Sequence, residues 1–391
     1  MSAESTKGLP NRRDFLTTSA AVVATGLAAG YSTLAAATRP SSPEPFSGVG
    51  DSTPHRVIID TDPGVDDALA ILLAFRSPEL KIEALTPVAG NVPLEFTLPN
   101  ALRLVEIAGR SDVPVAAGAN APLTRKLVTA AYAHGENGFG GVEFAAPKTK
   151  PVTESAPELI RRIVRASPGE ISLLVLGPFT NIALALRLDP GLAKQIRRIV
   201  FMGGSLSGGN ITPSAEFNIY VDPEAAHIAF HSGIPMTMVG LDVTRKVQLS
   251  DAHIKAIESA QNPSAQAAGR ILRSTMNRIR KMTPGSTAGP TMHDSLAASV
   301  LIDPSILTLE DYFIDVETQG QLTAGETLGY KRLPIRRSPP LEMATTPAFG
   351  EKQVTEAPVP PASEPFRPNA KVATEVDTEK FFRLLVGRLT A

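Results

Sequence analysis

Short apolar runs alternate along the chain with longer segments of helical periodicity, beginning near residue 55. The short runs have the length and apolar content of buried strands and predict strands at residues 56–59, 82–88, 171–176, 198–202 and 235–239. Helices are predicted between them at residues 68–75, 98–108, 181–188 and 223–231. This alternation predicts an α/β fold with a single large, open, mostly parallel β-sheet and helices on both faces.

Two segments interrupt this pattern. Residues 38–54 are rich in Pro and Ser and predict a flexible linker, whereas residues 336–368 contain eight prolines and predict an extended surface insertion or lid. Periodicity returns at residues 372–389 as a strand followed by an amphipathic helix. We therefore expect one domain over residues 55–391 that includes the Pro-rich insertion.

Residues 1–37 have the pattern of an export signal. Paired arginines lie in Asn11-Arg12-Arg13-Asp14-Phe15-Leu16, a mild apolar run follows, and Ala35-Ala36-Ala37 offers a small-residue cleavage site. An ordinary apolar helix is the alternative, but the arginines before the run and the linker after it favour a twin-arginine signal. The run is too short and too rich in alanine for a permanent transmembrane helix. We expect an exported, periplasmic or secreted protein with no stable membrane span after export.

Composition narrows the classes of function. A hydrophobic content of 43% and a net charge of −1 suit a soluble globular enzyme, and the balance of charges gives no sign of a nucleic-acid partner. Cys is absent, which excludes disulfides, thiolate nucleophiles and iron–sulfur clusters. Trp is also absent, so stacking on a planar ligand must come from Phe, Tyr or His.

Four carboxylates lie close together where the first predicted strand meets its helix, in Asp60-Thr61-Asp62-Pro63-Gly64-Val65-Asp66-Asp67-Ala68. They repel one another, and burial would raise their pKa values unless a cation lies among them. Helix capping would explain Asp66 or Asp67 but not Asp60 and Asp62 at the strand end. Because a hard divalent cation prefers several carboxylate oxygens, the run predicts a metal or catalytic site.

Other distinctive sequences also follow predicted strands, at residues 177–178, 202–204 and 241–242. Ligands of open parallel sheets bind outside the carboxyl ends of the strands. These sequences and the acidic run therefore predict a single site at that edge of the sheet.

The acidic run resembles the N-terminal signature of the nucleoside hydrolases, the inosine–uridine-preferring family. The resemblance continues in the family's order through Gly90-Asn91, His134-Gly135-Glu136-Asn137-Gly138, Gly177-Pro178-Phe179-Thr180-Asn181, Met202-Gly203-Gly204, Glu216-Phe217-Asn218-Ile219-Tyr220, Asp222-Pro223-Glu224-Ala225 and His293-Asp294. It implies a Rossmann-like core and calcium-dependent hydrolysis of the N-glycosidic bond of a ribonucleoside to ribose and free base. It also implies a homo-oligomer, either a dimer or a tetramer.

The resemblance further implies roles for individual residues. One Ca²⁺ would be held by the carboxylates of Asp62, Asp67 and Asp294 and the backbone carbonyl of Thr180. The metal would lower the pKa of its bound water, and Asp62 would take the proton as general base, with Asp60 orienting the loop. Residues matching those that hold the ribose are Asp66, Asn91, Met202, Asn210, Glu216 and Asn218.

Histidines and turns leave some of these assignments open. His293 is expected to act as acid toward the leaving base or to contact it, and His134 to line the base pocket. The other four histidines need no special role: His55, His227, His231 and His253. For Glu216 and Asn218 a solvated turn is the weaker alternative, whereas for Asn210 a plain turn is a serious competitor.

Two other functions are compatible with parts of the sequence. A strand followed by Asp-x-Asp also opens the fold of aspartyl-nucleophile phosphohydrolases, although His293-Asp294 has no role in that scheme. An exported nucleoside- or ribose-binding protein without catalysis is the other alternative. Residues 277–283 carry no Tyr where some nucleoside hydrolases place aromatic base contacts, so the sequence leaves base preference open.

Overall fold

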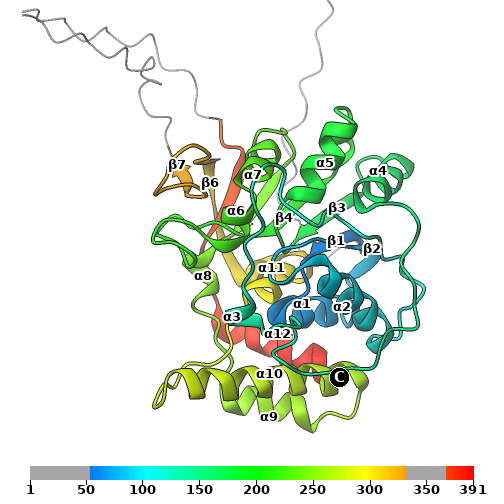
Figure 1. Ribbon diagram of the computed structural model, residues 1–391, viewed down its shortest axis with the longest axis vertical. Coiled ribbons are helices and arrows are strands. Elements are labelled where there is room, and N and C mark those ends of the chain that lie inside the picture. The colour runs from blue at the N-terminus through cyan, green and yellow to red at the C-terminus, as the bar shows by residue number, and fades with distance from the viewer. Residues whose placement is uncertain (1–52, 332–366) are drawn as a thin grey trace, which may run out of the picture. The chain divides into compact units, whose positions relative to one another are not determined.

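The computed structural model describes residues 53–331 and 367–391. They form one eight-stranded sheet with helices on both faces, which confirms the expected α/β fold (Figure 1). The strands, in their order across the sheet, are β2 (Leu80–Pro87), β1 (His55–Thr61), β3 (Ile171–Val175), β4 (Arg198–Met202), β5 (Met236–Val239), β8 (Ala370–Val376), β6 (Leu307–Val316) and β7 (Thr327–Tyr330).

The sheet is parallel from β2 to β8, whereas β6 runs antiparallel to β8 and β7 runs antiparallel to β6. The helices are α1 (Val65–Phe75), α2 (Leu94–Ile107), α3 (Ala131–His134), α4 (Ala156–Ala166), α5 (Thr180–Leu188), α6 (Phe217–Val221), α7 (Pro223–Phe230), α8 (Leu241–Thr244), α9 (Asp251–Ser259), α10 (Pro263–Met282), α11 (His293–Ile302) and α12 (Thr378–Thr390). Short 3₁₀ turns occupy Leu192–Gln195 and Pro304–Ile306.

Alternating strand residues separate two hydrophobic layers. On β1, Val57 and Ile59 pack into the layer formed with α1, α10, α11 and α12, whereas Ile58 packs into the layer formed with α4, α5 and α7. Successive side chains of a strand point to opposite faces, so a strand buried on both sides is apolar throughout. Figure 1 shows these two groups of helices on opposite sides of the strands.

The predicted strands and helices are present, with small shifts of their ends. The helix predicted at 98–108 begins earlier, at Leu94, because Pro99 is accommodated inside α2. The antiparallel pair β6 and β7 was not predicted, and neither were the helices α3, α4, α6, α8, α9 and α11 or most of α10.

Several predictions fall on residues that the structure does not describe. The export signal at 1–37 lies outside the described residues, as do the linker at 38–54 apart from its last two residues and the insertion at 336–368 apart from its last two residues. Within the described ranges, every helix is too short or too polar to cross a lipid bilayer.

Candidate active site

The turn from β1 to α1 holds three buried aspartates. Asp62 follows β1, and Asp66 and Asp67 lie in the first turn of α1. Asp67 Oδ2 accepts a hydrogen bond from the Gly64 backbone N–H (3.0 Å), and Asp67 Oδ1 accepts one from the Thr61 hydroxyl (2.5 Å). Asp67 therefore caps α1, which was the alternative to a metal or catalytic role for this residue. Capping does not explain why Asp62 and Asp66 are buried beside it.

Residues from two other segments complete this acidic cluster. The backbone N–H of Asn91 donates to Asp62 Oδ2 (2.6 Å), and the Asn91 side-chain amide donates to Asp67 Oδ2 (3.0 Å). Asp294, in the first turn of α11, brings its carboxylate to Asp66 and Asp67, and one oxygen of each lies within 4.8 Å of the other two. The structure thus brings together the aspartates that the sequence predicted, although the tightest trio contains Asp66 rather than Asp62.

Burial without a compensating cation dominates the electrostatics of the cluster. Within residues 53–331 and 367–391, no Lys or Arg forms an ion pair with Asp62, Asp67 or Asp294. Burial and then the neighbouring Asp67 carboxylate raise the pKa of Asp66 to about 8. Burial also raises the pKa values of Asp62 and Asp294 well above their ordinary range. A cation placed here would reverse these shifts.

Asp62 has a buried carboxylate oxygen that is free to bind a ligand. Its Oδ1 is buried and has no hydrogen-bond partner among the described residues. A Cβ built on Gly90 would lie 2.0 Å from Asp62 Oδ2, and one on Gly177 would lie 2.7 Å from Asp62 Oδ1, so only glycine permits this approach of the backbone. A buried set of carboxylate oxygens with one oxygen unpaired fits a hard divalent cation, which takes oxygen ligands.

The ends of β3 and β4 and the start of α6 supply the neighbouring polar groups. Asn218 donates from its amide to the Leu176 carbonyl (2.7 Å) and the Met202 carbonyl (3.2 Å), so it is fixed between two strand ends. Glu216 is the N-cap of α6 and accepts from the Gly204 backbone N–H (3.0 Å). Burial raises the pKa of Glu216 to about 7. Glu216 and Asn218 are both buried, so neither lies in a solvated turn.

Asn210 and Thr180 are placed differently from these residues. Asn210 is exposed, and its side-chain oxygen accepts from the Phe217 backbone N–H (2.9 Å), so its visible contact fixes the loop to the start of α6. Thr180 begins α5 and is buried, and its hydroxyl donates to Asp222 Oδ2 (2.7 Å). That bond uses the Thr180 hydroxyl and not its backbone carbonyl.

Both predicted histidines are part-buried. The Val65 backbone N–H donates to His134 Nδ1 (3.1 Å), which lies 3.8 Å from Asp66 Oδ1. His293 Nδ1 lies 2.7 Å from the Thr244 hydroxyl. Burial, followed by Arg278, lowers the pKa of His134 to about 3, and burial, followed by Arg245, lowers the pKa of His293 to about 4. Both rings are therefore neutral near pH 7.

Sequence reasoning assigned Asp60 to orienting the loop and missed its partners. Asp60 Oδ2 accepts from the Thr86 hydroxyl (2.7 Å) and the Asn181 amide (2.9 Å), which ties β1 to β2 and α5. Burial raises the pKa of Asp60 to about 7. Asn181 and Asp222 lie inside recognised motifs, so the sequence could have marked them as site residues. Nothing in the sequence marks Thr244, the partner of His293.

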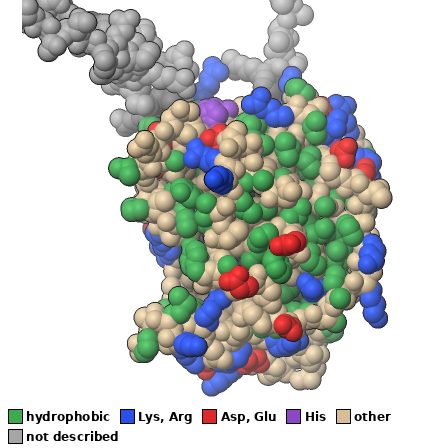
Figure 2. Space-filling model, in the orientation of Figure 1, with side chains coloured by type: hydrophobic (Ala, Val, Ile, Leu, Met, Phe, Trp, Pro, Cys, Tyr) green, Lys and Arg blue, Asp and Glu red, His purple; other side chains and the backbone are tan. Residues whose placement is uncertain are grey.

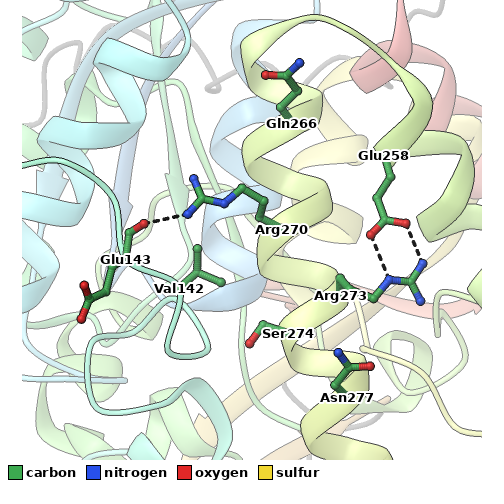
Figure 3. A pocket seen from close by; sticks show the side chains of 8 residues that line it. All are labelled: Val142, Glu143, Glu258, Gln266, Arg270, Arg273, Ser274 and Asn277. Atoms are coloured by element: carbon green, nitrogen blue, oxygen red, sulfur yellow. Dashed lines mark hydrogen bonds and ion pairs between the residues drawn. The ribbon is translucent and has the colours of Figure 1, made fainter.

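A broad surface hollow of about 690 Å³ lies elsewhere, between α9, α10 and the loop at residues 142–143 (Figure 3). Its two arginines already have partners. Arg273 forms a two-pronged ion pair with Glu258, and Arg270 donates to the Glu143 carbonyl (2.8 Å). Figure 2 shows charged side chains of both signs among apolar ones on the face drawn. The buried carboxylates, and not this hollow, have the chemistry of an active site.

Comparisons with known proteins agree with this placement. The family model "Inosine-uridine preferring nucleoside hydrolase" matches residues 57–383. The pyrimidine-specific ribonucleoside hydrolase RihA of Photobacterium profundum is 46% identical over 272 residues, which cover 70% of this chain and 87% of the relative. The non-specific ribonucleoside hydrolase RihC of Salmonella newport is 44% identical over 272 residues, covering 70% and 86%. The plant nucleoside hydrolase PpNRh1 is 34% identical and superposes with a TM-score of 0.75 over 87% of this chain and 100% of its own.

An open α/β sheet with buried carboxylates at its strand ends, matched over most of the chain by nucleoside hydrolases, defines an N-glycosyl hydrolase. The chain belongs to the inosine-uridine preferring nucleoside hydrolase family. This membership decides against the aspartyl-nucleophile phosphohydrolase.

Proposed function

We propose that this enzyme hydrolyses the N-glycosidic bond of ribonucleosides to ribose and free base, and that it depends on calcium. The observation that carries the proposal is the unpaired Asp62 Oδ1 inside a buried carboxylate cluster at the strand ends. The substrate class is supported by relatives that are named ribonucleoside hydrolases. One of those names is pyrimidine-specific and the other non-specific, so uridine and cytidine are the first substrates to test.

The proposed metal ligands are the carboxylates of Asp62, Asp67 and Asp294 and the backbone carbonyl of Thr180. All four residues are buried, and the three carboxylates have no cationic partner among the described residues. When bound, calcium would supply positive charge that orders oxygen donors and makes a nearby water more acidic. Asp66, which lies against Asp67 and Asp294, would bind a ribose hydroxyl at the edge of this set.

Asp62 is the proposed general base. Because the Asn91 N–H holds Asp62 Oδ2, the free Oδ1 is the oxygen available to take a proton from the attacking water. The ribosyl ring gains positive charge at C1′ as the base leaves. Asn91, Glu216 and Asn218 would hold the sugar hydroxyls, and Met202 would pack beneath the ring. The surrounding carboxylate and amide oxygens would stabilise that charge.

His293 and His134 are the proposed contacts of the leaving base. In His293 the Thr244 hydroxyl can donate to Nδ1, which leaves the proton on Nε2. A neutral ring of this kind donates a hydrogen bond to a base nitrogen rather than acting as a cationic acid. His134 has the matching arrangement, since its Nδ1 accepts from Val65.

The deciding experiment is ribose release from uridine, cytidine, inosine, adenosine and guanosine, with and without EDTA. We expect release that EDTA stops and that Ca²⁺ restores, with the initial rates ranking the bases. Release that continues fully in EDTA would reject the calcium dependence while keeping the hydrolase. No release from any nucleoside in the presence of Ca²⁺ would reject the substrate class.

We further propose that residues 1–37 direct export by the twin-arginine pathway, so that the enzyme acts in the periplasm or outside the cell. The paired arginines support this proposal. A reporter fused to residues 1–37 should be exported, and replacing both Arg12 and Arg13 with Lys should retain it in the cytoplasm. A homo-oligomer, dimer or tetramer, is proposed by analogy with the family and is tested by analytical ultracentrifugation.

A further inference from the structure

A second cluster of metal-binding side chains lies outside the active site, where α7 packs against β6. His227 is on α7, His231 caps the C-terminal end of α7, and Asp315 is on β6. The distances to Asp315 Oδ1 are 3.3 Å from His227 Nδ1 and 3.0 Å from His231 Nε2. The two imidazole rings lie side by side, with their centroids 4.3 Å apart. The sequence alone gave these histidines no role, because their partner is more than eighty residues away.

The spacing of the three side chains suits a tetrahedral ion. Histidines four residues apart project from the same side of a helix. One donor atom of each residue lies within 4.8 Å of the donor atoms of the other two. In a zinc site with metal–ligand bonds of about 2.0 Å, neighbouring ligand atoms lie about 3.3 Å apart. The two distances to Asp315 are therefore already near those of a loaded site.

A hydrogen-bond network explains the cluster less well. Asp315 Oδ1 also accepts from the Val316 backbone N–H at 2.9 Å, so three nitrogens surround one carboxylate oxygen. Such an oxygen offers about two lone pairs. An ion held between the two imidazoles and the carboxylate would relieve this crowding, because the two imidazole nitrogens would then face the metal. Only the Val316 N–H would still donate to the oxygen.

The cluster is also open to ions from solution. The side chains of His227, His231 and Asp315 are 49%, 33% and 24% exposed. Histidine is visible at the surface on the face drawn in Figure 2. An ion can therefore enter without unfolding either element, and a water molecule has room to complete its coordination.

We propose that His227, His231 and Asp315 form a zinc site that ties α7 to β6, with water as the fourth ligand. Two imidazoles and one carboxylate suit Zn²⁺, whereas Ca²⁺ and Mg²⁺ prefer sites built only from oxygen. This site is separate from the catalytic carboxylates, and the proposal does not rest on the proposed calcium dependence.

The test is a Zn²⁺ titration of the full chain without an affinity tag, by calorimetry, in a buffer that contains excess Ca²⁺ to occupy the catalytic carboxylates. Co²⁺ replaces Zn²⁺ in a second titration, because its visible absorption reports tetrahedral coordination. We expect one ion per chain, a rise in Tm on binding, and at least tenfold weaker binding in His231→Gln and in Asp315→Asn. His253→Gln, which changes a partly exposed histidine on α9, is the matched control and should bind as the wild type does.

His227→Gln provides a third variant, and a thermal melt without metal establishes that each variant is folded. A folded variant at any of the three positions that loses both the Co²⁺ absorption and the rise in Tm supports the site. Absence of binding to the wild type would overturn it. Equal affinity in wild type and all three variants, or an equal loss in His253→Gln, would also overturn it.

Discussion

At the level of single residues, the two oxygens of Asp62 have different surroundings. Oδ2 accepts from Asn91 at 2.6 Å, whereas Oδ1 has no partner among the described residues. Asp62→Asn keeps the shape and one oxygen for Asn91 but removes the negative charge. We expect ribose release to fall at least about 10³-fold, since both proton transfer and metal binding are lost.

The control for Asp62→Asn is Asp112→Asn, an exposed aspartate paired with Arg110. Far-ultraviolet circular dichroism should be unchanged in both variants, and ribose release should be unchanged in Asp112→Asn. A rate near that of the wild type for folded Asp62→Asn would remove Asp62 from the catalytic step.

The loss of rate on replacing His293 should be larger for a base that is a poorer leaving group. We expect His293→Ala to slow uridine or inosine hydrolysis about 10²-fold or more, and to slow a nitrophenyl riboside, whose leaving group needs no proton, far less. The measurement is kcat/KM for both substrates. Equal losses on the two would mean that His293 acts through the fold or the sugar and does not assist the leaving base.

The sequence was a better guide to which residues come together in the site than to the contacts that these residues make. Asp62 and Asp67 could be found because they lie in an acidic run at the end of a predicted strand, where a parallel sheet binds its ligands. Asp294 could be found only through the His293-Asp294 motif of the family that the sequence resembles. The contact of Asp66 with Asp294 and the bond between His293 and Thr244 could not be found. Those contacts depend on how α8 and α11 are rotated as they pack, and no local pattern in the sequence encodes that rotation.

At the level of elements, α7 is connected to the active site through its N-cap. Asp222 accepts from Ala225 N–H (3.0 Å) at the start of α7 and from the Thr180 hydroxyl (2.7 Å) at the start of α5. We expect Asp222→Ala to lower the free energy of unfolding by about 1–3 kcal/mol, since it removes a cap and leaves a buried hydroxyl unpaired. It should also lower kcat, because Thr180 loses its anchor.

Asp377→Ala is the matched control for Asp222→Ala, because Asp377 caps α12 through Lys380 N–H (2.9 Å). Urea unfolding should show a loss of about 1 kcal/mol for this variant with kcat unchanged. If Asp222→Ala lowered stability while leaving kcat at the wild-type value, the connection to Thr180 would have no catalytic role.

The parallel part of the sheet could be predicted and its antiparallel edge could not. Each of β1, β3, β4 and β5 is a short apolar run because helices bury both of its faces. By contrast, β6 is only partly buried and pairs with β8, whose partner residues lie some sixty positions later in the chain. A strand that is only partly buried has no continuous apolar run to mark it. The contact of Asp315 with His227 and His231 could not be predicted either, because no local pattern links α7 to β6.

At the level of the whole molecule, the buried carboxyl groups of the active site lower the free energy of unfolding when no metal is bound. Burial raises the pKa values of Asp60 and Glu216 to about 7 and that of Asp66 to about 8. In the unfolded chain these groups release their protons near pH 4. Between about pH 4 and pH 8 these three groups therefore bind more protons in the folded protein than in the unfolded chain, and they make the stability fall as the pH rises. The lowered pKa values of His134 and His293 act in the opposite direction, but only below about pH 6.5, where the unfolded histidines are protonated.

The metal-free enzyme should consequently have a lower Tm at pH 8 than at pH 5.5, with each such group contributing up to about 1.4 kcal/mol per pH unit while it is protonated only in the folded state. Ca²⁺ should raise Tm more at pH 8 than at pH 5.5, because protons compete with the ion for the same oxygens. Differential scanning calorimetry in EDTA and in Ca²⁺ at both pH values measures the four Tm values. Glu216→Gln, which cannot ionise, should reduce the fall in EDTA. A Tm that rises with pH in EDTA would show that these carboxyl groups are ionised in the metal-free fold, and that the charge of the cluster is balanced by something other than protons.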